Sequence, residues 1–195
     1  MSMRTKQAKN ELIERVVERV REKLSGKRAA MTESFVRQFY RDVPPDDFEG
    51  QSADNLYGLA LSYWNFAANR KDGAAKARVC NQNLEEHGWH SHHTIVEIVN
   101  DDMPFLIDSV TAALNGRDLT VYLVIHPITH LKRDEKGNVT DLRETSAKPA
   151  AGFGHESFMH VQINEQGVGK AQNEIRAMIL EVLDDVRVAV KDWKA

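Results

Sequence analysis

The spacing of apolar residues changes from helical to strand-like near residue 73, and this change constrains the fold more than any other feature of the sequence. Before Lys71-Asp72-Gly73, apolar residues recur every three or four positions, which is typical of amphipathic helices. After this turn they alternate with polar residues or form short runs, which is typical of β-strands. The pattern therefore predicts an N-terminal helical segment, residues 1–73, followed by an α/β domain, residues 74–195.

Three helices are predicted in the first segment, at residues 6–24, 29–40 and about 52–69. Ser25-Gly26 ends the first helix, and Pro44-Pro45 forbids continuation of the second. Ser52 precedes the third helix and is a residue type that caps helix N-termini. All three helices carry an apolar stripe that has to be buried against another part of the molecule.

The second segment begins with a short predicted strand, 76–82, and continues in the order strand, helix, strand, strand, strand, helix. The predicted ranges are 93–100, 105–115, 120–133, 139–143, 157–164 and 169–193, with a turn at 136–138 and an exposed loop at 145–154. Strand 93–100 is apolar on both faces, which predicts a central position in a sheet. The order is that of the split βαβ, ferredoxin-like α/β sandwich, an α+β fold with an antiparallel sheet.

Charge and composition exclude several classes of protein. Lys and Arg number 26 and Asp and Glu number 29, which gives a net charge of −3. Nucleic-acid binding, which needs uncompensated positive charge, is therefore not expected. No apolar stretch approaches the roughly 20 residues that cross a bilayer, so we expect no membrane span. Cys80 is the only cysteine, which fits a reducing compartment, and a cytoplasmic location is predicted.

The densest group of metal-ligand residue types lies before strand 93–100 and consists of Glu85, Glu86, His87, His90, His92 and His93. Consecutive residues of a strand point to opposite faces, so His92 and His93 cannot both reach one ion if the strand begins there. We therefore predict a solvated loop and no metal site. The alternative is a free-standing small-molecule or metal-binding enzyme that uses His87, His90 and His93 with Glu85 or Asp101. Cys80 is predicted to be a packed thiol and not a nucleophile, because no orienting group is evident.

Residues 100–108 join the predicted central strand to a helix, with acidic residues just before the first helical turn and Pro104 close to it. One interpretation is simple helix capping, because carboxylates favour the positive end of a helix and proline tolerates its first position. The other is that free backbone N–H groups at this helix start receive the carboxylate of a small ligand.

Several ordered motifs resemble the N-terminal region of the large bacterial NAD-specific glutamate dehydrogenases. The matching segments are 53–58 (ADNLYG), 83–89 (NLEEHGW), 94–110 (TIVEIVNDDMPFLIDSV), 123–127 (LVIHP), 156–161 (ESFMHV) and 186–193. They cover nearly all of residues 30 to 193. In that family this region looks like ACT-type regulatory modules, so the resemblance implies an ACT-type version of the ferredoxin-like fold.

The resemblance also implies a role. A family enzyme is several times longer, and it oxidatively deaminates L-glutamate to 2-oxoglutarate and ammonia while reducing NAD. Its catalytic lysine and NAD-binding domain have no counterpart here, so we assign no catalytic residue and no cofactor to this chain, and NAD to the parent enzyme. The expected function is that of a non-catalytic regulatory or assembly domain. Its expected partners are the remaining domains of the parent, further copies in a homo-oligomer, and an amino-acid effector as a candidate ligand.

ACT modules that bind amino acids carry an Asp-x-Pro-Gly-Leu-like turn between the first strand and the first helix. The corresponding candidate effector-binding residues are Asp101, Asp102, Met103, Pro104, Phe105 and Leu106. Phe105 stands where that turn has glycine, which restricts the backbone and fills the ligand space. We therefore expect Phe105 to pack into the core or against a neighbouring domain, and contacts between domains and subunits to be favoured over effector binding. Pairing of sheet edges between subunits stays open.

Overall fold

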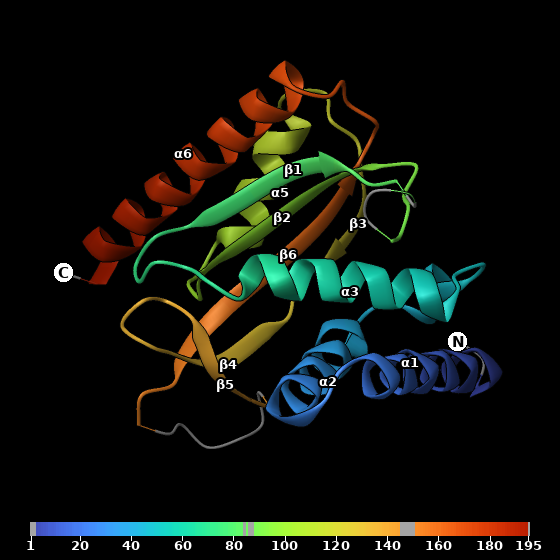
Figure 1. Cartoon of the computed structure of the whole chain (residues 1–195). Helices are drawn as coiled ribbons and strands as arrows, with labels where there is room; N and C mark the ends of the chain where they lie inside the picture. Colours follow the sequence, from blue (N-terminus) through green and yellow to red (C-terminus); the bar gives the residue numbers. More distant parts are fainter. Residues whose placement is uncertain (1–2, 84, 86–87, 145–150, 195) are drawn as a thin grey trace.

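The computed structural model describes residues 3–83, 85, 88–144 and 151–194 and has three layers, with a central sheet between two groups of helices (Figure 1). Helices α1 (Met3–Lys23), α2 (Gly26–Arg41) and α3 (Ala53–Ala67), with the short 3-10 helix η1 (Pro45–Phe48), cover one face. Helices α5 (Leu106–Asn115) and α6 (Lys170–Lys194) cover the other. The strands are β1 (Lys76–Asn81), β2 (Thr94–Asp101), β3 (Val121–Ile125), β4 (Ile128–Arg133), β5 (Val139–Arg143) and β6 (Gly154–Ile163).

All strand pairs of the sheet are antiparallel, and the order is β1-β2-β6-β4-β5, with β3 also paired to β6. β2 lies between β1 and β6, and seven of its eight residues are buried. The prediction of a central strand from its two apolar faces is therefore confirmed.

The predicted fold class is also confirmed, with one rearrangement along the chain. Strands β1, β2, β6 and β3 stand side by side in that order, α5 connects β2 to β3, and α6 follows β6 and packs beside β1. In the split βαβ layout the strand beside β2 would follow the last helix. Here β1 takes that place although it precedes β2 in the sequence. The sheet is thus that of an ACT-like α+β domain preceded by N-terminal helices.

The prediction of one continuous strand over residues 120–133 is wrong. β3 ends at Ile125 and β4 begins at Ile128, yet both pair with the same edge of β6. Pro127 lies at the break, where it has no N–H to donate, and its carbonyl oxygen accepts from the Phe158 N–H at 3.0 Å. The predicted hairpin of β4 and β5 is confirmed. Of the predicted loop 145–154, residues 145–150 lie outside the described residues, and β6 already starts at Gly154.

The sheet separates two apolar cores. On the α5 and α6 side, the core is aliphatic and includes Val96, Ile98 and Met159. On the opposite side, aromatic rings of α2 and α3 pack on the sheet, and Phe35 of α2 lies 5.5 Å from the ring of Phe158 in β6. Helices α1–α3 and one face of the sheet therefore share one continuous core.

Within the part of the chain that the structure describes, no helix combines the length and the apolar character needed to cross a bilayer.

Candidate functional site

The turn between β2 and α5 holds the six residues predicted as an effector site. Its start is fixed by the Asp102 N–H, which donates to the carbonyl oxygen of His155 at 3.0 Å, and the Ser109 N–H then donates to the Phe105 carbonyl in the first turn of α5. Leu106 is buried, whereas Asp102, Pro104 and Phe105 are exposed. The turn is therefore a fixed loop with a solvent-facing surface.

Phe105 adopts a left-handed backbone conformation with φ of 70°, the region that glycine enters most easily. The turn thus keeps the backbone shape that a glycine would give it, although the side chain is aromatic. Of the two packing alternatives expected for Phe105, the core is wrong, because 57% of the residue is exposed, and packing against a neighbouring domain stays a prediction. Its ring lies 6.2 Å from the ring of Trp193 near the end of α6, and Trp193 is itself 72% exposed.

The carboxylate of Asp101 accepts hydrogen bonds from two arginines. Its Oδ1 accepts from Nη2 of Arg70 at 2.7 Å, and its Oδ2 accepts from Nη1 of Arg187 at 2.8 Å. Burial alone would raise the pKa of Asp101, but these two charge-assisted hydrogen bonds outweigh burial and lower the pKa. The carboxylate is therefore ionised, and it connects the start of the turn to the segment after α3 and to α6.

Glu156 in β6 extends this network on the face of the sheet that α1–α3 cover. It is only 4% exposed, and it accepts hydrogen bonds from Arg70 Nε at 3.2 Å and from Arg133 Nε at 2.6 Å. Arg133 also donates to the carbonyl oxygen of Ala67 at 3.0 Å, at the end of α3. The network thus joins the helical layer, the sheet and α6 beside the turn. Sequence reasoning missed it, because the predicted strand began at Ser157 and left Glu156 outside it, between the polar residues His155 and Ser157.

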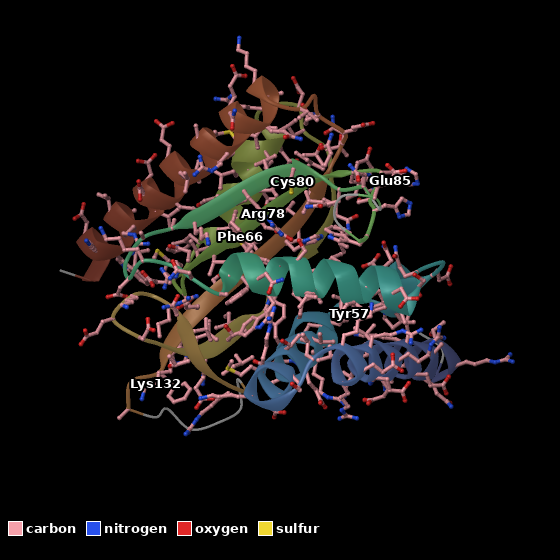
Figure 2. All side chains as sticks on the ribbon, in the orientation of Figure 1. Tyr57, Phe66, Arg78, Cys80, Glu85 and Lys132 are labelled. Carbon is pink, nitrogen blue, oxygen red and sulfur yellow. The ribbon has the colours of Figure 1, made fainter. Side chains whose placement is uncertain are left out.

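A second polar row, which the sequence analysis also missed, crosses the sheet under α3. Arg78, Glu97 and His160 are direct neighbours on β1, β2 and β6. The Glu97 carboxylate is fully buried; it accepts a hydrogen bond from Arg78 and lies 3.3 Å from Nδ1 of His160. The Arg78 guanidinium lies 4.7 Å from the ring centre of Phe66 on α3, and both residues are labelled in Figure 2. This row, like the Glu156 network, ties α3 to the sheet.

The described members of the histidine group are not gathered into the site suggested by the alternative interpretation. His93 and Asp101 flank opposite ends of β2, about 26 Å apart at 3.3 Å per residue, so they cannot share one ion. His93 stacks on Tyr122 with ring centres 4.4 Å apart, and His90 lies 5.1 Å from His92. His87 lies outside the described residues, and among those described no three His, Cys, Asp or Glu side chains are grouped to hold a metal.

Cys80 lies on β1 (Figure 2), where burial, reinforced by the charge of Glu97, raises the pKa of its thiol to about 11. The thiol accepts a hydrogen bond from Nε2 of Gln82 at 2.9 Å. A thiol with this pKa is protonated at neutral pH and is not an activated nucleophile.

Comparison with known proteins supplies a family. Residues 35–179 match the family model described as "Glutamate dehydrogenase, ACT1 domain". The chain is similar to the NAD-specific glutamate dehydrogenase of Halomonas elongata, with 36% identity over 190 residues, which is 96% of this chain and 12% of that protein. It is also similar to the NAD-specific glutamate dehydrogenase of Pseudomonas aeruginosa, with 32% identity over 162 residues, 82% of this chain and 10% of that protein. The chain thus spans about a tenth of the length of these relatives.

Proposed function

Because the chain belongs to the family of glutamate dehydrogenase ACT1 domains, we propose that it is the non-catalytic regulatory or assembly region of a large, cytoplasmic, NAD-dependent glutamate dehydrogenase. In this proposal, NAD and glutamate bind in other domains of the parent enzyme. The chain in turn contacts those domains and further copies of the enzyme. The match to the ACT1 family over 145 of the 195 residues (35–179) is the observation that carries the proposal.

The aromatic pair of Phe105 and Trp193 supports an assembly role. Both rings are more than half exposed and lie within 6.2 Å of each other beside the β2–α5 turn. Exposed aromatic side chains on a fixed turn are enriched at protein–protein contacts, where they are buried on association. Phe105 has a left-handed backbone conformation that glycine adopts at a lower conformational free energy. The presence of an exposed aromatic side chain at such a position fits a role in a contact with another domain or subunit.

Replacing both Phe105 and Trp193 with serine in the full-length enzyme is expected to weaken its assembly at least about tenfold, because two aromatic anchors are lost. Sedimentation velocity over a range of enzyme concentrations measures the assembled fraction. NAD reduction by the fully assembled variant should stay near the wild-type rate, since neither residue is placed near the chemistry. Val168→Ser is the control, because Val168 is an apolar residue that is 81% exposed. It is distant in sequence from the β2–α5 turn and is not part of the Phe105–Trp193 pair. Unchanged assembly of the double variant would contradict the assembly role.

The β2–α5 turn is retained as a candidate effector site, a second function favoured by its exposed Asp102 and its glycine-like backbone at Phe105. If an amino acid binds there, it should raise the melting temperature of the 195-residue chain, because a ligand of the folded state stabilises that state. A thermal-shift screen of the common amino acids, 2-oxoglutarate and NAD measures this rise. Asp102→Ala should abolish it, whereas Asp118→Ala, at the other end of α5, should not. No rise with any compound would remove effector binding by this chain and leave the assembly role.

A further inference from the structure

A cavity of about 330 Å³ lies between the helical layer and the sheet, at the end of β2 opposite the candidate effector turn. Its walls come from the end of α2, η1, the first half of α3, the segment 89–93, and strands β3 and β6. The volume falls at the lower end of the range of small-molecule sites, roughly 300 to 1,000 Å³. It therefore suits a compact ligand and not a dinucleotide.

The body of the cavity is apolar. Its aliphatic and aromatic walls are formed by Val43, Phe48, Leu56, Leu59, Leu123 and Ile125. Four of these residues belong to the helical layer and two to β3, so the cavity is the place where the two layers do not close on each other. Apolar surface of this kind favours an aliphatic or aromatic group of a few carbons.

Several polar groups of the cavity can donate hydrogen bonds. Trp89 lines it, is 1% exposed, and has an indole N–H with no acceptor among the described residues. A buried N–H without a partner is costly, and an acceptor brought by a ligand would remove that cost. The side-chain amide of Gln162 also lines the cavity and forms no hydrogen bond with the described residues. The imidazoles of His90, His92 and His93 add further groups able to donate.

The segment that carries Trp89 is held in place by contacts on α3. The side-chain amide of Asn55 accepts from the His90 N–H at 2.9 Å and donates to the His90 carbonyl at 3.3 Å. Gly58 lets the segment approach closely, since a Cβ on that glycine would lie 2.7 Å from Cβ of Trp89. The donors of the cavity are therefore presented by a braced backbone. Among the described residues that line the cavity, Asp47 is the one with a carboxylate, and it is exposed.

We propose that this cavity is a binding site for a small monocarboxylate with a branched or cyclic apolar body. The apolar walls take the body, and the carboxylate accepts from Trp89, Gln162 and the histidine side chains. The site is separate from the β2–α5 turn and does not depend on the role proposed for that turn. It also uses the histidine group without any metal ion.

The test compares ligands that share one carbon skeleton and differ in the head group. Calorimetric titration and thermal melting of the 195-residue chain at pH 7.5 are carried out with 4-methylpentanoate, 4-methylpentan-1-ol, 4-methylpentylamine and acetate. We expect saturable binding of 4-methylpentanoate, and binding at least about tenfold weaker for the alcohol, which lacks the charge, and for acetate, which lacks the body. Equal binding of acid and alcohol, tighter binding of the amine, which Asp47 would favour, or no binding of the acid would overturn the proposal.

Two variants locate the binding in the cavity. Trp89→Phe removes the N–H and keeps a ring, and it should weaken binding of 4-methylpentanoate about tenfold. Trp64→Phe is its control, because Trp64 is also buried in the same core but does not line the cavity. Leu123→Phe places a larger side chain in the cavity from the partly buried edge strand and should abolish binding, whereas Leu61→Phe on α3, outside the lining, should not. Wild-type affinity in Leu123→Phe would overturn the proposal even if Trp89→Phe failed to fold.

Discussion

Replacing Glu156 with alanine is expected to lower the free energy of unfolding of the chain by about 3–5 kcal/mol. The Glu156 carboxylate is nearly inaccessible to solvent and is shared by Arg70 and Arg133. Its removal leaves Arg133 without a carboxylate partner among the described residues and leaves Arg70 only Asp101, which Arg187 shares. This loss of charge compensation in a largely buried position is the source of the large effect. Chemical denaturation followed by far-ultraviolet circular dichroism measures the change.

A matched control separates burial from charge. Glu174 forms an ion pair with Lys170 on the surface of α6, where the two side chains are 57% and 91% exposed and 3.8 Å apart. Glu174→Ala should cost at most about 0.5 kcal/mol, because exposed pairs on a helix contribute little. A cost of less than about 1 kcal/mol for Glu156→Ala would show that solvent or rearrangement compensates the two arginines and that the network does not hold the layers together.

The Glu156 network also explains how the exposed β2–α5 turn is held without burial of its own side chains. Arg70, in the segment that follows α3, bonds to both Glu156 and Asp101, so the carboxylate at the start of the turn and the buried carboxylate of β6 are held by the same guanidinium. Arg187 fixes the other oxygen of Asp101 from α6. A contact made by Phe105 with another domain would therefore act on all three layers through one set of hydrogen bonds.

The helices and the central strand could be predicted from sequence because their signals are local. Apolar residues at helical spacing defined α1 to α3, and apolar residues on both faces placed β2 in the centre of the sheet. The split at Pro127 could have been predicted as well, since proline removes a donor from a strand. The alternation of apolar residues on both sides of it outweighed that signal in the prediction.

The polar networks could not be predicted, because they depend on register between distant strands. Arg78, Glu97 and His160 are far apart in the sequence and become neighbours only when β1, β2 and β6 pair as observed. Likewise, nothing local shows that β1 lies beside β2 and next to α6. The cavity that contains Trp89 arises where two layers meet, and no periodicity within one element reports such a place.

Replacing Phe35 with alanine is the second change with a large expected effect, a loss of about 3–5 kcal/mol. Phe35 on α2 is fully buried, with ring centres 4.9 Å from Trp64 on α3 and 5.5 Å from Phe158 on β6. Truncation leaves a cavity where the helical layer meets the sheet, and the aromatic neighbours on both sides lose their contacts. Chemical denaturation of Phe35→Ala measures the loss. Phe66→Ala, at a partly buried position of α3, is the control and should cost about half as much or less.

The same variant tests whether residues 1–73 and 74–195 unfold separately, as the predicted boundary suggests, or together. A shared core in which α1–α3 cover one face of the sheet favours a single cooperative unit. In that case Phe35→Ala should speed hydrogen exchange of the slowest amides in β2 and β6 by the same factor as those in α1–α3, about 100-fold or more for a loss of 3 kcal/mol. Faster exchange confined to α1–α3 would instead mean that the helical segment opens on its own and that the sheet with α5 and α6 is a separate folding unit.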